Sequence, residues 1–91
     1  MYEITNYSKA KARQLGVQIK PSKNKNKKID VYKNNNFIAS IGGAGYKDYP
    51  TYVKEDGLAK AKERRSLYKL RHNKDRFIVG SPGFYADNIL W

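Results

Sequence analysis

The segment IDVYKNNNFIASI at residues 29–41 limits the fold more than any other part of the chain. Two β-rich runs flank three asparagines at residues 34–36, and asparagine tolerates the positive φ of a tight turn. Because side chains alternate along a strand, Ile29 and Val31 share one face, and the apolar residues of the return strand share another. The segment therefore predicts an antiparallel β-hairpin.

The segment SKAKARQLG at residues 8–16 is typical of a short helix, with Ser8 as its N-cap and Gly16 as its end. VQIK at residues 17–20 alternates apolar and polar residues, so it is a candidate third strand, which Pro21 would end. The following lysines and asparagines predict a solvated loop.

Positive charge is concentrated toward the N-terminus. Residues 1–36 contain nine Lys and Arg and two acidic residues, whereas residues 37–91 contain ten and six. We therefore predict a basic N-terminal arm with a short helix at residues 1–27 and an α+β core domain at residues 28–91.

The main helix is predicted within residues 54–75, starting near Asp56 or Gly57. Pro50 argues against a regular helix through the tyrosines just before it. Ser81 and the proline after it are a helix start signal for the terminal segment FYADNILW. At the end of that segment, we expect Trp91 to fill the core between the hairpin and the main helix.

The predicted fold class is a small single α+β domain. In it, an antiparallel hairpin or three-stranded sheet packs on one main helix plus a short C-terminal helix.

The charge of the whole chain points to its partners. The 91 residues carry a formal net charge of +11, which attracts polyanions, and nucleic acid is the commonest of these. An acidic protein surface is the alternative partner. The chain contains no cysteine and no apolar run long enough to cross a bilayer, so we expect a soluble intracellular protein with no membrane partner.

The sequence contains no pattern typical of catalysis or of cofactor binding. The glycines of GGAG at residues 42–45 lack the spacing of a phosphate loop or a dinucleotide fingerprint. His72 is the single histidine, and the acidic residues are scattered. We predict no catalytic residue, no metal site and no cofactor.

Basic side chains on three segments are the candidate phosphate contacts. They are Lys9, Lys11, Arg13, Lys23, Lys25, Lys27, Lys28, Lys60, Arg64 and Arg71. Ion pairs with acidic residues are the other role open to the helix arginines, and Arg65 is the arginine favoured for a structural role. The tyrosines of residues 46–85 are candidates for base stacking, although filling the core is the favoured interpretation.

Three segments together resemble a known family. IASIGGAGYKDYPTY, ERRSLYKLRHNKDR and GSPGFYADNILW resemble, in that order, motifs of small uncharacterised proteins encoded by large DNA viruses and by phages. The resemblance covers about residues 28–91, and Pro50 and the threonine after it depart from the pattern. It implies a viral source and a role in the virion or at the genome, and it implies no activity. Asp48, His72 and Trp91 become motif residues, together with Arg64 and Arg65.

The predicted function is that of a non-enzymatic basic accessory protein of a virus or phage. It binds nucleic acid mainly through phosphate contacts, with DNA favoured over RNA. The alternative is a structural virion protein, minor capsid or internal, whose basic arm docks on capsid subunits. Both functions place the protein in the host cell interior, cytoplasm or nucleus, or in the virion.

Overall fold

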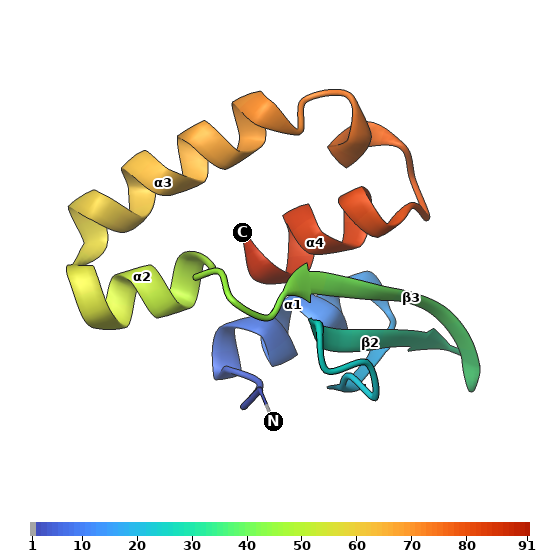
Figure 1. Ribbon diagram of the computed structural model, residues 1–91. Coiled ribbons are helices and arrows are strands. Elements are labelled where there is room, and N and C mark those ends of the chain that lie inside the picture. Colours follow the sequence, from blue (N-terminus) through green and yellow to red (C-terminus); the bar gives the residue numbers. More distant parts are fainter. Residues whose placement is uncertain (1) are drawn as a thin grey trace.

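Three antiparallel strands form the sheet of the computed structural model, which describes residues 2–91 (Figure 1). β2 (Lys27–Lys33) and β3 (Asn36–Gly43) are the predicted hairpin, and β1 (Gln18–Pro21) pairs with the other side of β2. Asn34 and Asn35 form the turn with φ of 53° and 67°, a conformation that asparagine adopts more readily than most residues. The predicted hairpin and third strand are confirmed.

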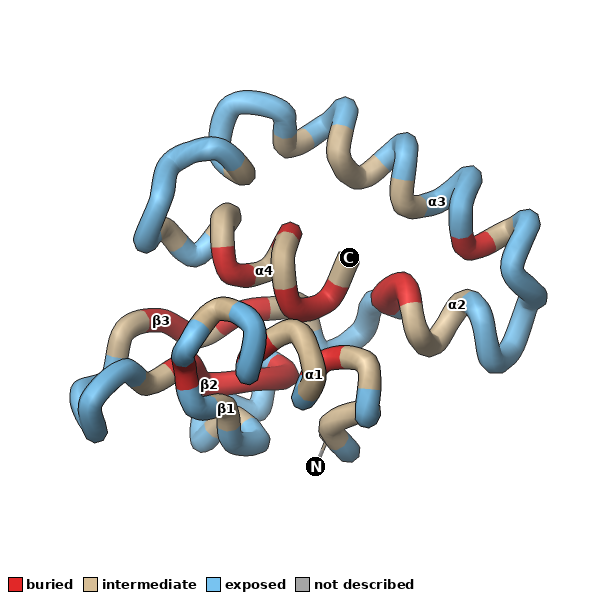
Figure 2. Tube along the Cα trace, turned by 180° about the vertical axis from the view of Figure 1, so that it is seen from behind, coloured by how far each residue is buried: buried red, intermediate tan, exposed pale blue. Residues whose placement is uncertain are grey.

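The core lies between this sheet and two helices, α1 (Asn6–Leu15) and α4 (Pro82–Leu90). α4 packs on β3, and α1 packs on α4 and on β1. Figure 2 shows the buried stretches gathered where these elements meet. The buried apolar residues there are Ala12, Val17, Ile29, Val31, Ala39, Ile41, Tyr85, Ile89 and Leu90. Most of the apolar surface that stabilises the fold is therefore buried in this one cluster.

Helix α1 is tied to the rest of the chain by hydrogen bonds as well as by apolar packing. Its N-cap is Thr5, whose side chain accepts from the backbone N–H of Ser8, and it ends at Gly16 with φ of 73°. The hydroxyl of Ser8 is buried and donates to the backbone oxygen of Ile89 at 2.9 Å. The segment expected to be a basic arm is thus part of the packed domain from α1 through β1.

A second pair of helices, α2 (Tyr49–Asp56) and α3 (Leu58–Arg71), extends to one side of the sheet (Figure 1). Asp48 caps α2 by accepting from the N–H of Thr51 at 3.0 Å. Pro50 lies in the first turn, where a missing N–H breaks no helical hydrogen bond. Gly57, with φ of 89°, separates the two helices. The expectation that Pro50 prevents a helix here was wrong, and α3 begins where the main helix was predicted.

The predicted fold class needs a correction in its helices. Residues 2–91 form four α-helices and a short 3₁₀ helix, η1 (Asp75–Phe77), rather than one main helix plus a short one. The sheet packs on α1 and α4, while the longest helix, α3, packs chiefly on α2. α4 starts as predicted, with Ser81 accepting from the N–H of Phe84.

None of the helices within residues 2–91 combines the length and the apolar character that a membrane span requires.

Candidate functional site

A buried ion pair joins the sheet to the start of α2. Lys28 Nζ lies 3.1 Å from a carboxylate oxygen of Asp48, and both side chains are almost fully buried. The same carboxylate oxygen accepts from the Tyr2 hydroxyl at 2.7 Å. Lys28 was a predicted phosphate contact, and this prediction is corrected because its ammonium group is used inside the protein.

These contacts alter the acidity of the groups around Asp48. Burial by itself would raise the pKa of Asp48, but hydrogen bonds from Thr51 and Tyr2 and the charge of Lys28 hold it below its usual value. Burial, and then the hydrogen bond to Asp48, raises the pKa of Tyr2. The carboxylate of this motif residue therefore stays charged and fully engaged, as expected for a structural group.

A row of stacked rings links α2, α3 and the end of the chain. The ring of Trp91 is stacked on Tyr68 with centroids 4.4 Å apart and an interplanar angle of 10°. On its other side Tyr68 is stacked on His72 at 4.4 Å, and Tyr52 lies 6.1 Å from Trp91. Burial raises the pKa of the Tyr68 hydroxyl. Trp91 thus contacts α3, but it is only partly buried at the edge of the core cluster and does not fill the core as expected. The motif residue His72 belongs to the same row.

This row forms one wall of a hollow of ≈ 690 Å³ between α3 and the end of β3. Other walls come from the beginning of β2, from residues 46–48 and from α4. Lys27, Arg64 and Arg71 border the hollow, so it combines positive charge with aromatic surface.

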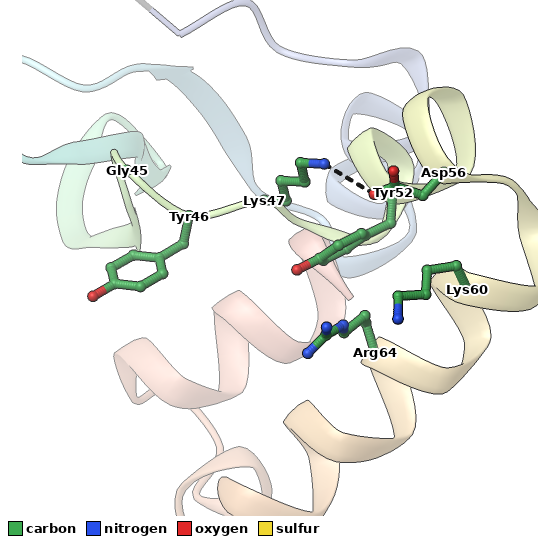
Figure 3. A pocket seen from close by; sticks show the side chains of 7 residues that line it. All are labelled: Gly45, Tyr46, Lys47, Tyr52, Asp56, Lys60 and Arg64. Carbon is green, nitrogen blue, oxygen red and sulfur yellow. Dashed lines mark hydrogen bonds and ion pairs between the residues drawn. The ribbon is translucent and has the colours of Figure 1, made fainter.

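A second hollow of ≈ 570 Å³ continues the first toward α2 (Figure 3). The two share Tyr46, Tyr52 and Arg64 in their walls, so they are neighbouring parts of one surface. Lys47 is neutralised there by Asp56, at 2.9 Å. Lys60 and Arg64 have no ion-pair partner among residues 2–91, and their charge is available to an anion.

The structure separates the predicted phosphate contacts into groups. Lys27, Lys60, Arg64 and Arg71 lie along one surface beside the two hollows. Lys9, Lys11 and Arg13 are on α1, and α4 lies between α1 and α3 in both views (Figures 1 and 2). Lys23 and Lys25 lie in the exposed loop before β2. The ten predicted residues therefore do not form one continuous interface.

The tyrosines also fall into two classes that the sequence did not distinguish. Tyr49 and Tyr85 are buried, which agrees with the favoured core-filling role. Tyr46 is 79% exposed, and Tyr52 lines both hollows. Arg65 lies over the ring of Tyr49 at 4.2 Å, so it makes a structural contact, although within residues 2–91 this is not the ion pair with an acidic residue that was predicted.

The acidic and histidine side chains of residues 2–91 form no cluster of three that would hold a metal ion. No family model matches the chain, and neither the curated proteins nor the solved structures contain a significant match. The resemblance to viral and phage proteins therefore remains a prediction.

Proposed function

We propose that this chain is a non-enzymatic accessory protein of a virus or phage that binds nucleic acid mainly through phosphate contacts. The observation that carries the proposal is the basic ridge, which we define as Lys60, Arg64 and Arg71 of α3 beside the two hollows. DNA is the favoured polymer over RNA, and the site of action is the host cell interior or the virion. The viral or phage source is inferred from the resemblance of residues 28–91 to small proteins of large DNA viruses and phages.

The spacing of the basic ridge suits a phosphate backbone. Lys60 and Arg64 are four residues apart, and Arg64 and Arg71 are seven apart, so all three fall on one face of the helix. The ridge extends over about 16 Å of helix at the standard rise per residue. A row of unpaired cations of this length neutralises successive phosphates and releases their counterions, which is the main source of sequence-independent affinity.

The two residues most suited to catalysis are engaged in structural contacts. Asp48 caps α2 and pairs with Lys28, and the His72 ring is stacked on Tyr68. This arrangement supports the non-enzymatic part of the proposal.

A salt titration of binding to a short labelled DNA duplex tests the proposal. Affinity should fall steeply between about 50 and 200 mM salt. Replacing two ridge residues, Arg64→Gln with Arg71→Gln, should reduce the slope of log affinity against log salt by about 2. The matched control is Lys54→Gln with Lys62→Gln, which removes the same charge from exposed positions outside both hollows. Absence of binding to DNA and RNA at low salt would refute the proposed function. Equal effects of the ridge variant and the control variant on the salt slope would refute the role of the basic ridge in binding.

A structural virion protein is the second candidate, and one observation favours it. Five large apolar side chains in the second half of α3 and around η1 are exposed: Leu67, Leu70, Phe77, Ile78 and Val79. Apolar surface of this kind is typical of contacts between proteins. Because α1 is packed into the domain, this surface is a better candidate for docking on capsid proteins than the basic segment. Many copies per purified particle, at ordered positions, would support this function over the first.

A further inference from the structure

The exposed ring of Tyr46 lies against the backbone of a glycine, Gly43. A Cβ atom at Gly43 would lie only 2.7 Å from Cδ2 of Tyr46, so the ring rests against backbone that only glycine leaves open. The N–H of Tyr46 also donates to the carbonyl oxygen of Gly43 at 3.2 Å, which closes a tight turn. The rest of the Tyr46 side chain remains exposed to solvent. This arrangement presents an aromatic surface that the fold positions but does not cover.

Charged and aromatic groups from α2 and α3 line the smaller hollow together with Tyr46, whose ring lies at its outer edge (Figure 3). Arg64 lies 6.0 Å from the centre of the Tyr52 ring, and Lys60 is one helical turn before it. The hollow, at ≈ 570 Å³, falls in the size range of small-molecule sites. It therefore offers an aromatic surface on one side and two unpaired cations on the other.

We infer that this hollow binds an unpaired base of single-stranded nucleic acid. The base stacks on Tyr46, and the adjoining phosphate contacts Arg64 and Lys60. Bases in a duplex are stacked on their neighbours and offer no free face, whereas bases in a single strand stack readily on exposed aromatic side chains. The inference rests on the proposed function and adds to it a preference for single strands.

Binding of a single-stranded DNA, a blunt-ended duplex of the same composition and a nucleoside triphosphate should be compared at one salt concentration. The native chain should bind the single strand most tightly. Tyr46→Ala should weaken single-strand binding by roughly 5- to 150-fold, the range found when a stacked aromatic is truncated, and should leave duplex binding unchanged. Tyr46→Phe should retain the affinity, because the ring does the stacking.

Two further variants isolate the role of the ring. Phe37→Ala removes another exposed aromatic side chain, next to the hairpin turn, and should leave single-strand binding unchanged. Gly43→Ala should displace the Tyr46 ring and weaken single-strand binding. Circular dichroism of each variant checks that the fold is intact.

The outcomes separate this inference from the proposed function. If the native chain binds no nucleic acid, both fail. If single strand and duplex bind equally and Tyr46→Ala changes neither, the stacking site is refuted while phosphate binding stands. If the nucleoside triphosphate binds as tightly as the strand and displaces it, the hollow is a site for free nucleotides and the single-strand inference is wrong.

Discussion

The two sides of the molecule bury their apolar residues to very different extents. In α4, which faces the sheet, Tyr85, Ile89 and Leu90 are all buried. In α3, Ala61 is the single buried residue, and Leu70 is 75% exposed. Isolated helices of this length are marginal in water, so α3 depends on its contacts with α2, on the ion pair of Lys69 with Asp87 of α4, and on the stacking of Tyr68 with Trp91. The sheet side holds most of the stability, and the α2–α3 side is left with surface for binding.

The largest effect we expect comes from the buried ion pair between Lys28 and Asp48. Lys28→Met leaves the buried carboxylate of Asp48 without its cation. Removing one partner of such a pair costs about 3–5 kcal/mol, measured as the free energy of unfolding in denaturant. The double variant Lys28→Met with Asp48→Asn should recover much of this loss, because asparagine also caps a helix and carries no charge. A double variant no more stable than Lys28→Met would show that the buried charge is not the cause.

The next effect tests the difference in burial directly. Ile89, with no exposed surface, belongs to the core cluster, and Ile89→Ala should lower the free energy of unfolding by about 2–5 kcal/mol. Leu70→Ala on α3 should change it by no more than about 0.5 kcal/mol. Similar losses for the two variants would mean that α3 contributes as much to stability as the core does.

Trp91→Ala should have a smaller and more local effect. The ring is partly buried and stacked on Tyr68, so its loss should cost about 2 kcal/mol. Amide hydrogen exchange should become faster in α3 while β2 keeps its protection. Uniform loss of protection across both elements would indicate that the two sides unfold as one unit.

The smallest effect is a dependence of stability on pH. Because the pKa of Asp48 is lower in the folded protein than its ordinary 3.8, its contribution to stability is present above about pH 4 and is lost as the pH falls through the folded value. Asp30 accepts from Ser22 and Ser40, has a lowered pKa and acts in the same direction. Asp48→Asn should make stability less sensitive to acid, leaving the part due to Asp30. An unchanged acid profile would show that Asp48 makes no such contribution.

Local signals in the sequence identified the elements whose ends have specific residue types. The Asn34–Asn35 turn, the end of α1 at Gly16 and the Ser81 cap each depend on a backbone conformation or hydrogen bond that few residues supply. α2 was missed because Pro50 was interpreted as a helix breaker, although proline is tolerated in a first turn. The capping role of Asp48 was the signal available for it.

The arrangement of the candidate site was not predictable from local pattern. Lys28 stands in a run of lysines and asparagines that is typical of a solvated loop, yet its partner Asp48 lies twenty positions later. The contact of Tyr46 with Gly43 and the gathering of basic side chains beside it depend on how α3 lies against the sheet side. Only the tertiary packing decides which of many lysines and tyrosines face one another.

The single tryptophan of the chain, Trp91, lies where the two sides of the molecule meet. Its indole contacts Tyr52 of α2 and Tyr68 of α3, and its backbone oxygen accepts from the hydroxyl of Tyr7 in α1. When tryptophan is excited selectively over the eight tyrosines, the intrinsic fluorescence of the protein therefore reports on this junction. A shift in its emission on adding an oligonucleotide would show, without any label, that the ligand has changed the surroundings of this indole at the wall of the larger hollow.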